Sequence, residues 1–316
     1  MTKIQSPNKW PISKFQSSNV WKLNIGIWPI RLRSGPILSL SKDWALFGFC
    51  ILVIGFFFAT GYSASDENLR VHFIDVGFGD AILIESPHSQ NILIDAGGQK
   101  SGGKVRGYLL RHNIKTLDAA IITHPHRNHF EGFFSLLNSI TVRRLYTNGH
   151  PQEEGPYDQL LEEFRKRSVP VAVLKEKGRV SIPRRQMSIR LDILSPRDLK
   201  GSANDNSFVV WLRYRKTSFL FTSDIGGDQQ SRVFTQYPQV LQSSCIQVPH
   251  HGLNVSEPLK AVSPQTIFVA SMGPDPRHPA GPQDLEELAG LVFRTDIHGT
   301  IVLESDGKTL RVISEK

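Results

Sequence analysis

Cysteine is almost absent from this sequence: its 316 residues include two, Cys50 and Cys245. Cys50 lies inside a run of apolar residues and Cys245 in an expected buried strand, so no disulfide partner is implied for either. A zinc site built from thiolates is also excluded, because the part of the chain that is expected to fold contains a single cysteine. Histidine and carboxylate side chains remain as candidate metal ligands.

Acidic residues are scarce at the N-terminal end. The chain has a formal net charge of +8, yet residues 1–65 hold seven Lys/Arg and one acidic residue, Asp43. This segment accounts for six of the positive charges, so the rest of the chain is close to neutral. The basic composition is therefore weak evidence for a polyanionic partner, because most of the charge flanks an apolar segment.

Charge is absent from residues 44–60, which read W-A-L-F-G-F-C-I-L-V-I-G-F-F-F-A-T. This length lies between the core of a signal peptide and a short membrane-spanning helix. Lys42 on the N-terminal side predicts export of the chain beyond the run. We interpret residues 44–62 as a signal peptide core or a single transmembrane anchor, with the domain periplasmic, extracellular or held outside the cytoplasm. A run without a polar face argues against a buried core helix. Residues 1–43, basic and without periodicity, are expected to be disordered.

Residues 66–316 alternate short apolar runs with helical patterns and are expected to form one domain. Strands are expected at residues 70–76, 81–85, 91–95, 117–123, 171–174, 188–194, 208–214, 218–221 and 245–248. Helices are expected at residues 104–112, 131–137, 157–167, 227–236 and 284–293. The pair Asp306-Gly307 indicates the turn of a closing hairpin. Hairpins with helices between them favour an α/β fold of four layers, an α/β/β/α sandwich, over a doubly wound parallel sheet.

Histidines cluster in the segment I-I-T-H-P-H-R-N-H-F-E-G at residues 121–132. His124, His126 and His129 fall within six residues, where a buried strand is expected to end. Imidazoles at positions i and i+2 of a loop can converge on one cation, and the third can reach a second cation. The alternative is a surface loop that is rich in histidine by chance, but its position at a strand end favours a site.

Two more polar groups directly follow apolar strands. Asp224 stands in F-L-F-T-S-D-I, and His250 and His251 follow C-I-Q-V-P. An isolated aspartate at a strand end is usually a turn former, and an isolated histidine is usually a surface residue. Three such groups at the ends of successive strands together indicate a metal site.

Seven short motifs in one order resemble the C-terminal metallo-β-lactamase-like domain of the ComEC competence protein family. They are D-V-G-F-G-D, I-L-I-D-A-G-G, T-H-P-H-R-N-H-F-E-G, N-D-N-S, T-S-D-I, V-P-H-H-G and R-H-P, and they span about residues 69–312. The resemblance implies a metal-dependent hydrolase with one or two Zn²⁺ or Mn²⁺ ions and DNA or another phosphodiester as substrate. In that family the domain is assigned to degradation of the non-transported DNA strand during uptake.

The resemblance also implies roles for individual residues. His124 and His126 match the first-metal pair, Asn128 and His129 stand at the second-metal pair, and Asp224 matches the bridging carboxylate. For the late second-metal histidine we prefer His250, with His251 as the alternative. Asp95 matches an acidic residue that orients the ligands from behind. Residues matching the lining of the same cleft are Asp75, Asp80, Asn206, Ser207 and His278.

The implied mechanism is metal-assisted hydrolysis, in which a bound metal lowers the pKa of water from 15.7 towards about 7. Asp224 and Asn128 would hold the metals. His278 would contact a phosphate or protonate a leaving group, although between Arg277 and Pro279 it is equally consistent with a simple loop residue.

Four features depart from the family pattern. Asn128 replaces an aspartate, and an amide oxygen is a poorer zinc ligand than a carboxylate. Residues 151–249 contain no histidine, whereas many zinc hydrolases of this fold have a first-site histidine there. Phe78 replaces a polar residue, and Ser223 replaces a glycine. The alternative interpretation is therefore a weakened or inactive domain that binds nucleic acid or a partner protein. The missing histidine and the H-H-G motif argue against β-lactam hydrolysis.

Overall fold

The computed structural model describes residues 68–87, 89–151, 156–182, 189–253, 255–273 and 283–314. The segments predicted as disordered (residues 1–43) and as a signal peptide core or anchor (44–62) lie outside the described residues, as does His278. Within the described ranges, no helix has the length and apolar character needed to cross a membrane. The predicted domain boundaries and export remain predictions.

The first sheet has eight strands in the order β16-β15-β1-β2-β3-β5-β7-β8. Their bounds are β1 (Leu69–Phe73), β2 (Ile82–Ser86), β3 (Gln90–Ile94), β5 (Ala119–Ile122), β7 (Leu145–Thr147), β8 (Val171–Val173), β15 (Ile301–Ser305) and β16 (Leu310–Ser314). Strands from β16 to β3 pair antiparallel, whereas β3, β5, β7 and β8 run parallel. A separate small sheet joins β4 (Thr116–Leu117) to β6 (Thr141–Val142).

The second sheet has six strands in the order β14-β13-β12-β11-β10-β9. Their bounds are β9 (Arg190–Ser195), β10 (Val209–Tyr214), β11 (Thr217–Phe221), β12 (Cys245–Gln247), β13 (Ile267–Ala270) and β14 (Leu291–Arg294). β9, β10 and β11 pair antiparallel, and β11 to β14 run parallel. Both sheets thus combine an antiparallel part with a parallel part.

The two sheets pack face to face because alternate residues of their strands are apolar. Leu69, Val71 and Phe73 of β1 belong to the same buried cluster as Leu191 and Ile193 of β9. A strand turns successive side chains to opposite faces, so this spacing directs one face of each sheet into a shared core.

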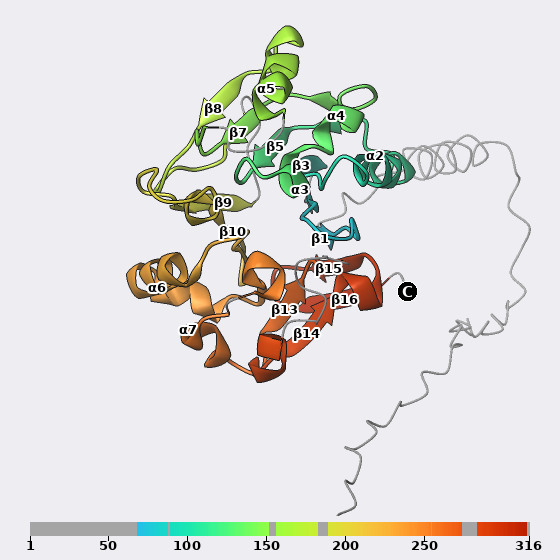
Figure 1. Ribbon diagram of the computed structural model, residues 1–316. Coiled ribbons are helices and arrows are strands. Elements are labelled where there is room, and N and C mark those ends of the chain that lie inside the picture. The colour runs from blue at the N-terminus through green and yellow to red at the C-terminus, as the bar shows by residue number, and fades with distance from the viewer. Residues whose placement is uncertain are drawn as a thin grey trace, which may run out of the picture. The chain divides into compact units, whose positions relative to one another are not determined.

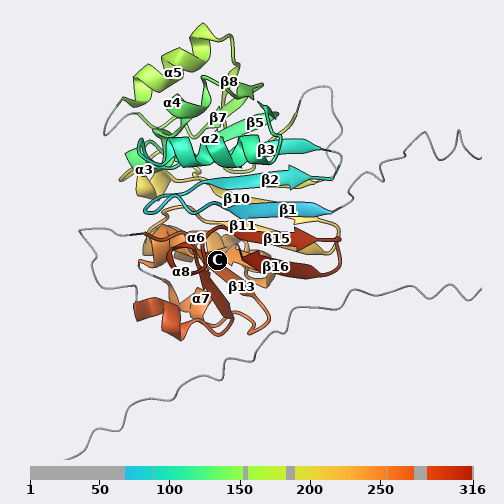
Figure 2. The same cartoon turned by 90° about the vertical axis from the view of Figure 1, so that its right-hand side faces the viewer.

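Helices cover the outer faces of both sheets (Figures 1 and 2). On the first sheet these are α2 (Gly102–Arg111), α3 (Arg127–Phe130), α4 (Phe133–Leu136) and α5 (Tyr157–Lys166); on the second, α6 (Gly227–Gln236) and α7 (Glu257–Lys260). Each helical layer shares its own buried cluster with the sheet beneath it. The predicted α/β/β/α sandwich is therefore confirmed.

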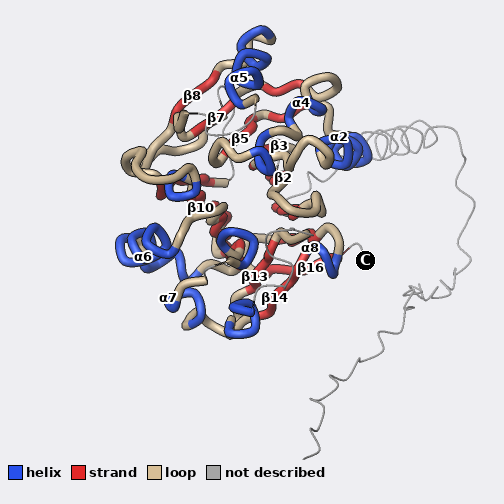
Figure 3. Tube along the Cα trace, viewed as in Figure 1, coloured by secondary structure: helices blue, strands red, loops and turns tan. Residues whose placement is uncertain are grey.

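Two expected helices differ in the structure. A helix is expected at residues 284–293, but they form a 3-10 turn, η4 (Gln283–Glu287), followed by strand β14 (Figure 3). β14 exists because it pairs in parallel with β13, a tertiary interaction that local sequence does not report. The helix expected at residues 131–137 is shorter in the structure, where it is α4, and a separate short helix, α3, precedes it. Between them, a Cβ on Gly132 would overlap the backbone of Ala96, so the chain must pass β3 closely there.

Candidate metal centre

The candidate site forms where strand ends from the two sheets meet. Asp95 follows β3, the segment from His124 to His129 follows β5, Asp224 lies three residues after β11, and His250 and His251 follow β12. Backbone hydrogen bonds tie these ends together: the Asp95 N–H donates to Ile121, and the His250 N–H donates to Ser223. The site residues are therefore positioned by the pairing of strands that are far apart in the sequence.

Asp224 is the residue on which the imidazoles converge. Its Oδ2 lies 3.2 Å from Nε2 of His129, 3.5 Å from Nε2 of His251, 3.8 Å from Nε2 of His124 and 4.0 Å from Nε2 of His250. Asp224 is 3% exposed, and its Oδ1 has no hydrogen-bond partner among the described residues. An unpaired buried polar atom costs about 1–3 kcal/mol, which a bound cation would offset. The donor set therefore fits a metal.

His124 and His126 face each other across the predicted first-metal position. Nε2 of His124 lies 3.0 Å from Nδ1 of His126. The Thr123 hydroxyl donates to Asp95, so it accepts from Nδ1–H of His124 at 3.1 Å and leaves the Nε2 lone pair directed into the site. Burial, with the charge of His129, holds the pKa of His124 well below its ordinary value. The ring is therefore neutral, which is the form that binds metals.

His129 is held in place from behind by Asp95. Its Nδ1–H donates to Oδ2 of Asp95 at 2.8 Å, and Asp95 also accepts from the N–H and hydroxyl of Thr123 at 2.9 and 2.7 Å. This arrangement turns Nε2 of His129 towards Asp224. The structure thus places Asp95 where the predicted orienting residue belongs, although its role remains a prediction.

The charges of the buried groups around Asp224 are strongly coupled. Burial lowers the pKa of His129, but the negative charges of Asp224 and Asp95 outweigh it and raise that pKa well above its ordinary value. Burial raises the pKa of Asp224, but His129 and His251 outweigh it, so the Asp224 pKa lies well below its ordinary value. Asp224 is consequently an anion, as a metal-bridging carboxylate must be.

The distances favour His251 over His250 as the late second-metal histidine. His251 is 5% exposed, and its Nδ1–H donates to the Ser271 carbonyl at 2.8 Å, which turns Nε2 towards Asp224. The His250 side chain is 25% exposed and lies farther from Asp224. Both residues have positive φ, 48° and 57°, and this turn brings the second ring inwards. The geometry thus favours the alternative, His251, and the identity of the metal ligand remains a prediction.

Asn128 lies at the predicted second-metal position, where its Nδ2 is 3.3 Å from Nε2 of His251. In this orientation the amide donates to the nitrogen that a metal would use. The Phe78 ring packs against His251, with ring centres 4.5 Å apart. Phe78, at a position where the family resemblance predicts a polar residue, thus places an apolar ring beside the predicted second-metal position.

The remaining predicted residues fall into two groups. Asp80 belongs to the site: it is buried, and its carboxylate oxygens lie 3.7 Å from Nδ1 of His129 and 4.0 Å from Nδ1 of His251. Asp75 instead accepts from the N–H of Gly77 and shapes that turn. Asn206 bonds to the backbone of Lys200 and Ser202, and Ser207 is fully buried. The assignment of Asp75, Asn206 and Ser207 to the predicted cleft therefore remains a prediction.

Sequence reasoning did not identify Gln247 or Asn204. The Gln247 side chain accepts from the N–H groups of Thr222 and Ser223, both at 3.1 Å, and donates to Asp80 at 2.8 Å. It therefore links the turn that presents Asp224 to the opposite wall of the site. A glutamine inside the apolar strand C-I-Q-V was the available signal. Nδ2 of Asn204, in N-D-N-S, lies 3.4 Å from Nε2 of His250.

Residues 74–230 match the model of the metallo-beta-lactamase superfamily. The chain carries a metallo-beta-lactamase superfamily domain. Every histidine of the H-P-H-R-N-H segment and Asp224 lie within the matched residues. The family assignment supports a metal-dependent hydrolase, and the clustered His and Asp side chains support binding of a divalent metal.

Two curated relatives share sequence with this metallo-beta-lactamase domain. ComE operon protein 3 of Bacillus subtilis (strain 168) is 28% identical over 288 residues, which are 83% of this chain and 36% of that protein. The uncharacterized protein YcaI of Escherichia coli (strain K12) is 25% identical over 204 residues, 62% of this chain and 24% of that protein. The chain thus spans about a third or less of the length of these relatives.

A solved structure shares the fold. A variant of the CmlA β-hydroxylase superimposes with a TM-score of 0.52 at 13% identity, over 84% of this chain and 60% of that one. At this identity the similarity shows the fold alone, and a fold hosts many reactions. The reaction of this chain has to be argued from its site.

Proposed function

We propose that this chain is a metal-dependent phosphodiesterase of the ComEC-like branch, with DNA or another phosphodiester as substrate. The observation that carries the proposal is the convergence of four imidazoles on the Asp224 carboxylate, those of His124, His129, His250 and His251. The imidazole of His126 adds a fifth nitrogen beside that of His124. The motif order and the similarity to ComE operon protein 3 favour this branch.

The protein's own residues would prepare the site for hydrolysis. Bound divalent metal would supply a Lewis acid that activates water and polarises a phosphoryl oxygen. Thr123 and Asp95 fix the ring orientations of His124 and His129, and the Ser271 carbonyl fixes that of His251. Asp224 supplies the negative charge shared by both halves of the site. We propose zinc or manganese as the metal.

The direct test is turnover of a chromogenic phosphodiester and of single-stranded DNA by the purified full chain with added Mn²⁺ or Zn²⁺. We expect hydrolysis that the Asp224→Ala variant loses. Asp198→Ala is a suitable control, because it makes the same change at an exposed aspartate. Metal-loaded protein that turns over neither substrate at any metal concentration would contradict the proposal. If such protein still binds DNA, the chain is an inactive binding domain, an alternative that the contact of Asn128 with His251 favours.

We also propose that the domain acts outside the cytoplasm, exported or anchored through residues 44–60. The support is the uncharged apolar run and the preceding Lys42. A fusion of residues 1–67 to alkaline phosphatase, which is active only after export, should be active in cells. Replacing two residues of the apolar run with lysine should abolish that activity, and an inactive wild-type fusion would refute export.

A further inference from the structure

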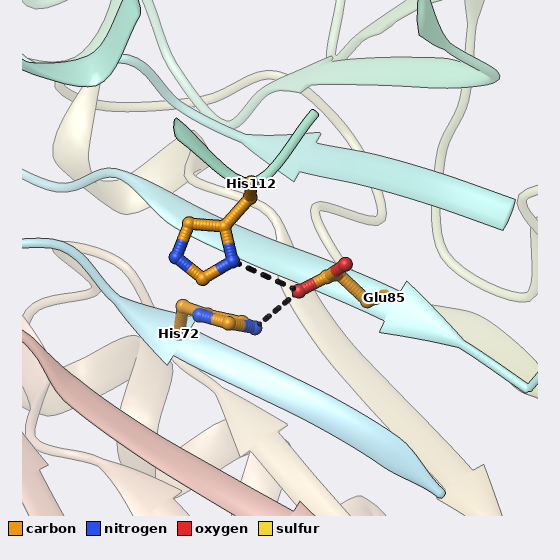
Figure 4. Close-up of side chains that lie close together, drawn as sticks. All are labelled: His72, Glu85 and His112. Atoms are coloured by element: carbon orange, nitrogen blue, oxygen red, sulfur yellow. Dashed lines mark ion pairs between the residues drawn. The ribbon is translucent and has the colours of Figure 1, made fainter. Parts of the chain in front are cut away.

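A second cluster of histidine and carboxylate side chains is built from elements other than those around Asp224. His72 on β1, Glu85 on β2 and His112 directly after α2 each offer one ligand atom, and the three atoms lie within 4.8 Å of one another (Figure 4). We propose that these three residues form a further binding site for a divalent transition metal of the zinc type.

The strand register brings His72 and Glu85 to one face of the first sheet. Arg70 of β1 pairs with Glu85 of β2, so His72, two residues further along β1, is the diagonal neighbour of Glu85. Diagonal neighbours on one face are close enough for long side chains to meet. Helix α2 covers this face, and His112 at its C-terminal end closes the cluster from above.

His72 is oriented as metal-binding histidines usually are. It is 1% exposed, and its Nδ1 lies 2.8 Å from the hydroxyl of Tyr108 on α2. A ligating imidazole typically bonds through its second ring nitrogen, which fixes the direction of the first. In His72 this leaves Nε2 directed at Glu85 and His112.

The contact between His72 and Glu85 has the length of a hydrogen bond but not its direction. Nε2 of His72 is 2.8 Å from Oε1 of Glu85, yet this buried nitrogen has no hydrogen-bond partner among the described residues. A hydrogen bond requires the acceptor near the N–H axis. A metal bound on that axis would place the carboxylate oxygen to one side, and the two side chains would move slightly apart, because the ligands of a tetrahedral ion subtend a wide angle.

Charge and access are also compatible with a metal. Arg70, which faces Glu85 across the strand pair, has its Nε 2.9 Å from Oε2 of Glu304. Nδ1 of His112 is 3.7 Å from Oε1 of Glu85, and the two side chains are 33% and 23% exposed. Solvent can therefore reach the cluster and complete the coordination shell. Two imidazoles and one carboxylate are a donor set that transition metals use.

The test is the zinc content of the full chain after equilibrium dialysis, measured by elemental analysis in an Asp224→Ala background that removes the central carboxylate of the other site. We expect this protein to retain Zn²⁺, and to lose one equivalent per chain when Glu85→Gln or His112→Ala is added. Glu304→Gln is the matched control, because it makes the same change on β15, on the other side of β1 in the same sheet, and should keep the zinc.

Thermal unfolding supplies a second readout. Zinc should raise the Tm of the Asp224→Ala protein, and each of the Glu85 and His112 changes should remove that rise. His112 lies at a partly exposed helix end, so His112→Ala keeps the test decisive if Glu85→Gln fails to fold. Equal zinc content and equal Tm shifts in all variants would show an ion pair instead of a metal site. Phosphodiesterase activity depends on Asp224, so failure of the proposed function would appear separately.

Discussion

Asn128 is the predicted site residue whose side chain is least suited to bind a metal. Its side chain lies at the predicted second-metal position but offers a neutral amide, and its Nδ2 faces His251. A carboxylate there would add both a negative charge and a stronger ligand oxygen. The serine in T-S-D-I is a milder departure. Ser223 has a φ of 48°, which glycine adopts more readily, but its hydroxyl gains a hydrogen bond to Thr123.

We therefore expect Asn128→Asp to increase the affinity for the second metal by at least about tenfold, equivalent to ~1.4 kcal/mol. The phosphodiesterase rate should rise with it. Titration of the purified variant with Mn²⁺, followed by turnover at each metal concentration, measures both effects. Unchanged metal affinity and rate would show that Asn128 is not at a metal position.

A substitution at Asp95 tests whether the orientation of the His129 ring affects metal binding. Asp95→Asn removes the charged acceptor of the His129 Nδ1–H group while nearly preserving side-chain shape. Loss of an orienting partner typically lowers metal affinity or activity by about 10–100-fold. The apparent metal affinity should fall by that factor, with the circular dichroism spectrum unchanged. Full affinity in the folded variant would argue against the orienting role.

At the scale of elements, the site depends on how closely three loops approach one another. A Cβ on Gly79 would overlap the backbone carbonyl of Asn128, and one on Gly273 would overlap the backbone of Gly77. The loop at residues 77–79 is thus confined between the histidine segment and the end of β13. Small residues at these contacts allow the second-metal side of the site to close.

Gly79→Ala should therefore push the loop off Asn128 and reduce metal affinity as well as stability. Gly77→Ala is its control, because Gly77 also has a positive φ but a Cβ there meets no atom within 4 Å. The control should lose about 1–2 kcal/mol of stability from backbone strain, with metal affinity retained. Chemical denaturation and metal titration of both variants separate the two effects. Equal losses of metal affinity would contradict the close approach of this loop to Asn128.

The edge of the second sheet contains an ion-pair cluster. Asp192 of β9 accepts from Arg179 at 2.9 Å, from Arg190 at 2.6 Å and from Arg213. Burial raises the pKa of Asp192, but the three guanidinium groups outweigh it and hold the pKa below its ordinary value. This stabilisation is present above the unfolded pKa of about 3.9 and is lost as the pH falls through the lower folded value.

Asp192→Asn should therefore lower the free energy of unfolding at pH 7 by about 1 kcal/mol or less, since solvent screens part of the interaction. The difference from wild type should shrink as the pH falls from 7 to below the unfolded pKa of about 3.9, because the unfolded state then takes up the proton more readily than the folded state. Urea denaturation at both pH values measures it, with the exposed Asp198→Asn as control. A difference that does not depend on pH would rule out the electrostatic explanation.

Strand ends and short motifs were predictable from sequence, but the convergence of the site residues on one point was not. Asp224 follows an apolar run, and the histidine segment follows another, so both could be placed at strand ends. Their meeting depends on the packing of two sheets, which no local pattern encodes. The choice between His250 and His251 depended on a turn with two positive φ angles. β14 was missed because its pairing with β13 overrides the local helical pattern.

At the scale of the whole molecule, the sandwich explains how segments more than a hundred residues apart can serve one cation site. Residues after β3 and β5 belong to the first sheet, and residues after β11 and β12 belong to the second. The shared core between the sheets fixes the distance between these edges. The domain's metal chemistry is therefore a property of the packed pair of sheets and not of either sheet alone.

A metal centre at Asp224 is tested most sharply by the zinc content of the full chain, measured by elemental analysis after dialysis against Zn²⁺. The comparison is between the Glu85→Gln variant and the Glu85→Gln/Asp224→Ala double variant. The Glu85→Gln change removes a ligand of the second proposed site, so that zinc bound there does not contribute to the measurement. We expect at least one zinc per chain, which Asp224→Ala abolishes while the fold is retained. Zinc content that is the same with and without Asp224 would refute a metal centre there.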